Sequence, residues 1–87
     1  MDKKAVAKAM VELQKSLING ELALMFEYMN ELESLAGEAY MMKVLSTLAR
    51  SLPDSPLVQL YIEPILADHP EEYEAFFGIE IEKPGGD

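Results

Sequence analysis

The single histidine of this 87-residue chain, His69, stands among acids: Asp68 precedes it, and Glu71 and Glu72 follow closely. A histidine and a carboxylate three residues apart, such as His69 and Glu72, share one face of a helix and could ligate a metal ion or exchange a proton. The same stretch has the pattern of a helix start. Pro70 suits the first helical position, and acids in the first turn complement the helix dipole. We therefore interpret Asp68 or His69 as a cap.

The helix that would follow covers residues 70–78 and carries three aromatic side chains, Tyr73, Phe76 and Phe77. Large aromatic rings of this kind would close one end of the core. Residues 79–82 then alternate isoleucine and glutamate, which is the period of an extended strand. The sequence thus predicts a short extended tail, with residues 84–87 disordered.

The residues needed for common catalytic sites are missing. The chain has no cysteine, which excludes disulfides, thiolate nucleophiles and cysteine-ligated metals. No serine lies in a Gly-x-Ser-x-Gly turn, and no glycine-rich loop is present to hold a phosphate. A domain of this size also has little room for a pocket deep enough to raise a carboxyl pKa. We predict a protein that is not an enzyme, with no catalytic residues, no metal ligands and no cofactor.

One segment points to an alternative with a metal. In residues 20–40, GELALMFEYMNELESLAGEAY, Glu21 and Tyr28 are separated by six residues on an amphipathic helix, and a second apolar helix follows. This segment resembles the first helix pair of ferritin-like di-iron bundles, and the resemblance implies that Glu21 is a metal ligand. Those bundles also need Glu-x-x-His pairs on facing helices, whereas residues 46–53 read STLARSLP. The alternative is a carboxylate-rich metal-binding bundle that dimerisation completes.

Composition and charge indicate the class of partner. The chain is 49% apolar, which favours one folded domain, and we assign it to residues 1–83. The net charge is −9: residues 1–20 carry +2 and residues 21–87 carry −11. Such a surface repels phosphate backbones and anionic lipid, so we expect no nucleic acid and no membrane as partners. An acidic inhibitor or immunity-type protein is a further alternative. The absence of cysteine favours the cytoplasm.

Most of the chain has helical period. Apolar residues recur every three or four positions in three stripes: Val6, Met10, Leu13 and Leu17; Leu22, Met25, Met29, Leu32 and Ala36; Met41, Leu45, Leu48 and Leu52. Asp2 is the expected N-cap of the first helix and Gly20 its left-handed C-cap. Gly37 either breaks the second helix or lies inside one long helix, and we favour the break. After LPDSP, Ser55 is expected to cap a helix that Pro64 must end, kink or restart.

These patterns predict an all-α fold, a small bundle of four to five helices with antiparallel neighbours. The expected function is a small non-catalytic accessory protein that binds another protein, possibly basic, through an apolar, Met-rich, acid-framed surface. The methionines fill the core in one interpretation and form an adaptable binding groove in another. For binding, we predict that contact area comes from Met25, Met29 and Tyr40, and that steering of basic partners comes from Glu27, Glu31 and Glu38. Three apolar stripes on a thin bundle also predict a homo-oligomer, most simply a dimer.

Overall fold

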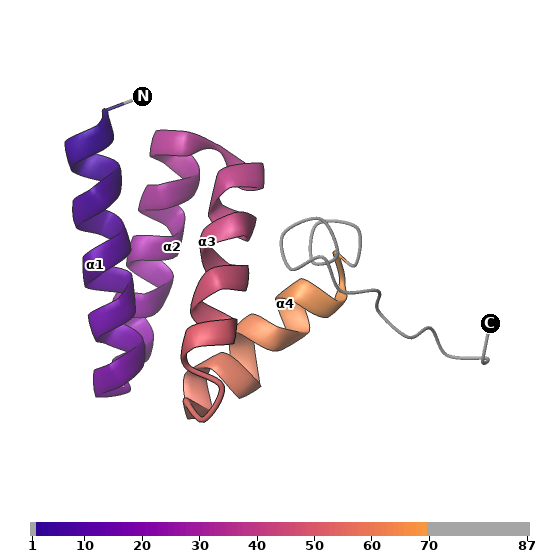
Figure 1. The fold of residues 1–87 in the computed structure, drawn as a ribbon. Helices are drawn as coiled ribbons and strands as arrows, with labels where there is room; N and C mark the ends of the chain where they lie inside the picture. Colours follow the sequence, from indigo (N-terminus) through magenta and orange to yellow (C-terminus); the bar gives the residue numbers. More distant parts are fainter. Residues whose placement is uncertain (1, 70–87) are drawn as a thin grey trace.

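The computed structural model describes residues 2–69 as an all-α bundle, with no strand in that part of the chain (Figure 1). Its elements are α1 (Lys3–Asn19), α2 (Leu22–Ala36), α3 (Glu38–Ser51), the π-helix η1 (Val58–Ile62) and α4 (Glu63–Ala67). The predicted fold class is confirmed. The helix expected at 70–78, the strand at 79–82 and the tail at 84–87 lie outside the described residues.

Both ends of α1 follow the local chemistry of the sequence. The Asp2 carboxylate accepts hydrogen bonds from the backbone N–H groups of Lys4 and Ala5, at 3.1 and 3.2 Å, and so satisfies two of the free donors at the helix start. Gly20 has φ 69° and ψ 33°, the left-handed conformation that glycine adopts without steric cost. Its N–H, and that of Glu21 at 2.8 Å, close on the Ser16 carbonyl. The predicted caps are confirmed.

Gly37 breaks the helix between α2 and α3, as the sequence analysis favoured. It is the single residue between them and has φ 91° and ψ 164°. An L-residue essentially never adopts this backbone region, which is open only to glycine. The chain therefore reverses direction within one residue, and α2 and α3 become antiparallel neighbours (Figure 1).

The loop after α3 ends in a helix that bends around a proline. Ser55 caps this helix by accepting from the Val58 N–H at 3.4 Å, and its own hydroxyl reaches the Leu17 carbonyl at the end of α1, at 3.5 Å. Pro64 does not end the helix. The Glu63 N–H, one residue earlier, donates to the carbonyl of Val58, five residues back. This wider π turn accommodates a proline, which has no N–H and whose ring would press on the preceding turn of a regular α-helix.

The core lies around α2, which stands between and behind α1 and α3 (Figure 1). Both outer helices pack against α2, and η1 and α4 cover the lower end of α3. Fifteen buried apolar residues form one continuous cluster, and they are Val6, Ala9, Leu13, Leu17, Met25, Met29, Leu32, Met41, Met42, Val44, Leu45, Leu48, Val58, Ile62 and Leu66. Because α1 and α3 meet chiefly through α2, the side on which they face each other stays open.

Two serines are buried in this core and differ in their hydrogen bonding. The Ser16 hydroxyl donates to the Leu13 carbonyl at 2.6 Å, whereas no group among residues 2–69 bonds to the Ser46 hydroxyl. A buried unpaired hydroxyl costs about 1–3 kcal/mol, and alanine is also the better helix former. We expect Ser46→Ala to raise the free energy of unfolding by about 1 kcal/mol.

The matched control for this prediction is Ser16→Ala, which removes a hydroxyl that is already bonded and should lower the free energy of unfolding or leave it unchanged. Urea denaturation followed by circular dichroism measures both variants, with an unchanged m-value as the sign that only stability has moved. A destabilised Ser46→Ala would show that the hydroxyl has a partner in the folded protein.

Candidate protein-binding groove

A groove with a volume of about 420 Å³ lies between α1 and α3. Four of its lining residues come from α1 and six from α3. They are Ala7, Met10, Val11 and Gln14, and Tyr40, Lys43, Val44, Thr47, Leu48 and Ser51. No carboxylate is among them. Carbon-rich side chains dominate, and the polar groups are hydroxyls, one amide and one ammonium.

The groove forms because each of the two helices has a second stripe beside its core stripe. On α1, Ala7, Val11 and Gln14 follow each other at spacings of four and three. On α3, Tyr40, Val44, Thr47 and Ser51 do so at four, three and four. These spacings place each set on one helical face.

A hydrogen bond between two lining residues joins α1 to α3. The Tyr40 hydroxyl lies 3.9 Å from the Met10 sulfur, and both side chains are half-buried. A hydrogen bond to a thioether is weak, so this contact holds the two walls together only loosely.

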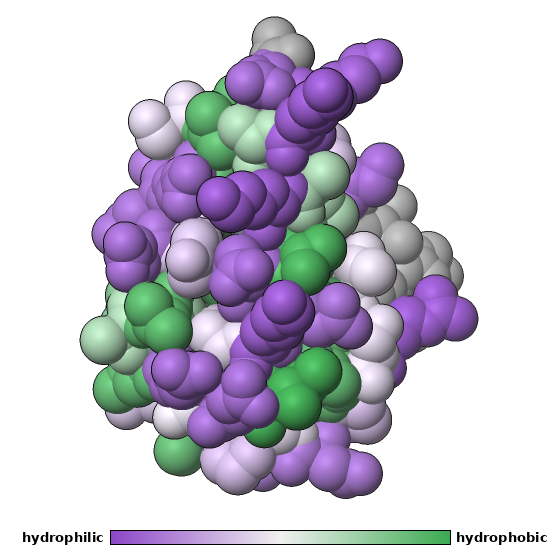
Figure 2. Space-filling model, turned by 90° about the vertical axis from the view of Figure 1, so that its left-hand side faces the viewer, coloured by the Kyte–Doolittle hydropathy of each residue, from purple (hydrophilic) through white to green (hydrophobic). Residues whose placement is uncertain are grey.

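Val11 is a large apolar residue of the groove that is exposed, with 48% of its surface accessible. Elsewhere, the outer side of α1 is mostly hydrophilic, with apolar side chains in separate small patches (Figure 2). Single exposed apolar residues are normal on a protein surface, but one that borders a concave apolar groove is a candidate contact residue.

The predicted contact residues Met25 and Met29 do not lie on the surface. Met25 is fully buried and Met29 is 6% exposed, and both belong to the core around α2. The core-filling interpretation of these methionines therefore holds, and the binding role predicted for them does not fit their placement. Tyr40 alone of the three predicted contact residues lines the groove.

The predicted acids Glu27, Glu31 and Glu38 are exposed, and none of them lines the groove. Glu27 and Glu31 lie on α2 near Tyr28. The pKa of Tyr28 is raised, first by its partial burial and then by the negative charges of Glu12, Glu27, Glu31 and Glu21. Glu27 and Glu31 lie on α2, Glu21 precedes it and Glu12 lies on α1, and none of the four lines the groove.

A second apolar contact joins α2 to η1. The rings of Phe26 and Tyr61 meet edge to face, with centroids 5.7 Å apart and planes at 80°. Phe26 is 42% exposed, and Leu60 beside Tyr61 is 67% exposed. Edge-to-face pairs contribute about 0.5–1.5 kcal/mol beyond area burial. This contact joins η1 to α2, and neither ring lines the groove between α1 and α3.

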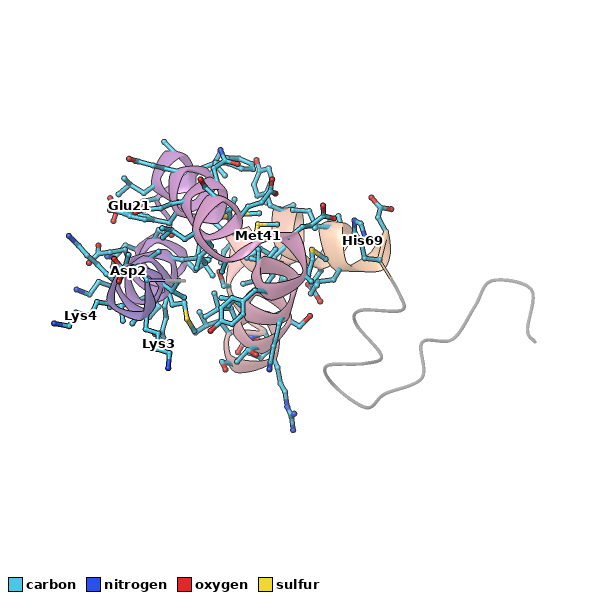
Figure 3. The ribbon with its side chains drawn as sticks, turned by 90° about the horizontal axis from the view of Figure 1, so that it is seen from above. Asp2, Lys3, Lys4, Glu21, Met41 and His69 are labelled. Atoms are coloured by element: carbon cyan, nitrogen blue, oxygen red, sulfur yellow. The ribbon has the colours of Figure 1, made fainter. Side chains whose placement is uncertain are left out.

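The residues of the metal alternative do not come together. Figure 3 shows Glu21 beside α1 and α2 and His69 at the far end of α4. Within residues 2–69, no three histidine, aspartate or glutamate side chains converge on a point that could hold an ion. The His69 N–H donates to the Leu66 carbonyl at 3.0 Å, so this residue finishes α4. The capping role expected for it at residue 70 lies outside the described part.

Val11, Val44 and Thr47 line the groove but were not predicted as contact residues. The signal was present, because Ala7, Val11 and Ile18 form a second apolar series on the first helix. The spacing does not show which of the two stripes faces the core, because that depends on how the three helices pack.

None of the helices in residues 2–69 is long and apolar enough to cross a bilayer. No family model, curated protein or solved structure matches the chain.

Proposed function

We propose that this chain is a small non-catalytic interaction protein that binds another protein through the groove between α1 and α3. The observation that carries the proposal is the groove itself: an apolar hollow between two parallel helices, with Val11 exposed at its edge. Recognition of a helix in such a groove is a recurrent mode of protein binding, in which apolar side chains at helical spacing anchor the partner. Met10 and Tyr40 would supply an adaptable floor.

The other features of the chain agree with a protein partner. A net charge of −9 disfavours a phosphate backbone as ligand. The absence of cysteine agrees with a cytoplasmic location, which we include in the proposal. Self-association through the same groove is the competing use, since a second copy could cover the apolar surface.

The test is capture of partner proteins from an extract of the native host on immobilised full chain, compared between two variants. Val11→Glu places a carboxylate in the groove and should remove the partner, since a buried unpaired charge costs several kcal/mol. Leu60→Glu is the matched control, because Leu60 is an exposed apolar residue, at 67%, but lies on η1 and does not line the groove. It should retain the partner.

Quantitative mass spectrometry of the captured proteins reads out the comparison. A protein lost with Val11→Glu and kept with Leu60→Glu supports the proposal. Identical capture by both variants would refute it. Light scattering on the unmodified chain and both variants tests for self-association. If a second copy occupies the groove, the measured molecular mass should fall only with Val11→Glu.

A further inference from the structure

The charges around the groove indicate which kind of helix it accepts. Resting on the proposed function, we propose that the partner segment is an amphipathic helix of about three turns, supplied by another protein. Its apolar stripe would enter the groove, and carboxylates would line its flanks. The length of the groove, the cations beside it and the positions of the acids all favour such a helix.

The length follows from the lining residues. On α1 they run from Ala7 to Gln14, and on α3 from Tyr40 to Ser51. At 1.5 Å per residue these spans are about 10 and 17 Å, which is the length of about 7 to 11 residues of a helix. A partner helix in this position would lie opposite α2 and turn the open arrangement of three helices into a four-helix bundle.

The cations of both walls lie beside the groove. Lys43 lines it directly. On α1, Lys3 stands four and seven residues before Ala7 and Met10, which line the groove, and therefore shares their face of the helix. Figure 3 shows Lys3 and Lys4 leaving the N-terminal end of α1 in different directions, with Lys4 extending away from α3. Lys3 and Lys43 make no ion pair with another residue of the range 2–69.

The acids of the two walls point away from the groove or are already engaged. Glu12 pairs with Lys15 at 3.7 Å. Glu38 stands two residues before Tyr40, about 200° around the helix and so on the opposite face of α3. The Asp2 carboxylate caps α1. The rim is therefore cationic on a chain whose net charge is −9.

Screening by salt determines whether the lysines at the groove rim or the net charge of the chain has the larger effect on a helix bound in the groove. At physiological ionic strength the Debye length is about 8 Å, so exposed charges beyond this distance act weakly. A helix seated in the groove would place its flanks next to the rim lysines. These cations should set the preference, and acidic flanks should be favoured over basic ones.

Two synthetic helical probes test this preference. Both are fluorescein-labelled peptides of about 14 residues, long enough to form some helix alone, with leucines at i, i+3, i+4 and i+7. The acidic probe has glutamates on both flanks, and the basic probe has lysines at the same positions. Fluorescence anisotropy titrations with the full chain at 0.15 M salt should show the acidic probe binding at least tenfold tighter. This ratio should shrink at 1 M salt.

Single substitutions test whether the preference for the acidic probe arises at the groove. Lys43→Gln should reduce the ratio at least threefold, whereas Ser34→Glu changes the net charge by the same amount on the exposed side of α2 and should leave it unchanged. Val11→Glu should weaken both probes at least tenfold. Tighter binding of the basic probe, equal binding of the two, or no binding of either would overturn the inference.

Two further outcomes would assign the groove to another occupant and so also overturn it. A tenfold gain in probe affinity on changing Phe76 and Phe77 to serine would mean that the chain's own segment competes for the groove. A concentration-dependent mass that Val11→Glu abolishes would mean that a second copy occupies it. The proposed function fails separately: it fails if Val11→Glu leaves partner capture intact, and it survives if capture is lost while the basic probe binds better.

Discussion

Replacing Gly37 with alanine should lower the free energy of unfolding by about 2 kcal/mol and convert part of the protein to a dimer. Gly37 has φ 91° and ψ 164°, a region that costs a residue with a Cβ atom on the order of 1–3 kcal/mol. Steric contact is not the cause, since a Cβ atom built at this position meets no atom within 4 Å among the described residues. The cost comes entirely from the backbone conformation.

We expect the dimer because alanine at residue 37 would favour a continuous helix in place of the turn. Alanine is the best helix former, and Gly37 is the single residue between α2 and α3. A continuous helix over residues 22–51 would relieve the strain but would separate α3 from α2. The apolar face of each helix would then find its place on a second chain, which is domain swapping at a short hinge. Light scattering should show a species with twice the monomer mass, and its fraction should rise with protein concentration.

Gly20→Ala is the matched control. Gly20 also has positive φ, at 69°, and a Cβ atom there meets nothing within 4 Å in the described structure. Its conformation is the ordinary left-handed one, which an L-residue can adopt at a cost of about 1–2 kcal/mol. We expect a smaller loss of stability and no change of mass. An equal loss in both variants, both monomeric, would mean that the two turns tolerate a side chain alike and that α2 and α3 resist joining.

The sequence predicts the local parts of this fold well, because their causes lie within a few residues. The carboxylate of Asp2 finds its donors two and three residues away, and Gly20 ends α1 through bonds to a carbonyl four and five residues back. Ser55 and Pro56 start the last helix for the same kind of reason. Such caps do not depend on the rest of the molecule.

The conformation of the helix around Pro64 could not be predicted from the neighbouring residues alone. The missing N–H and the bulk of the ring are evident from the sequence, and they exclude a regular helical turn. They do not select among a stop, a kink and a π turn, since that choice depends on the side chains that the helix buries on either side of the proline. Val58, Ile62 and Leu66 are all in the core, so a continuous helix with one wide turn keeps all three buried.

The groove could not be found from the sequence for a related reason. Helical period shows that α1 has two apolar series, through Leu13 and through Val11. Which of them meets α2 is decided when three helices pack together, and the sequence gives no distance between α1 and α3. The same ambiguity led to the placement of Met25 and Met29 on a binding surface, because a stripe at the right spacing is identical in a core and in an exposed groove.

Met25→Ala should lower the free energy of unfolding by about 3 kcal/mol. The Met25 side chain is fully buried, and truncation of a buried methionine to alanine costs about 2–5 kcal/mol through lost burial and the cavity that remains. A chain of this size has a total stability on the order of 5–10 kcal/mol. The variant would therefore lose a large share of its stability and unfold at a distinctly lower temperature.

The control and the binding assay separate a core role from a contact role. Leu60→Ala truncates a side chain that is 67% exposed, and its free energy of unfolding should change by less than about 0.5 kcal/mol. Below its midpoint of unfolding, Met25→Ala should still bind the acidic probe within about threefold of the unmodified chain, because Met25 does not line the groove. If Met25→Ala instead kept its stability and lost the probe, the methionine would be a contact residue and the packing of α2 in the core would be wrong. Chemical denaturation and anisotropy on the same preparation distinguish the two cases, since a cavity changes unfolding and a lost contact changes affinity.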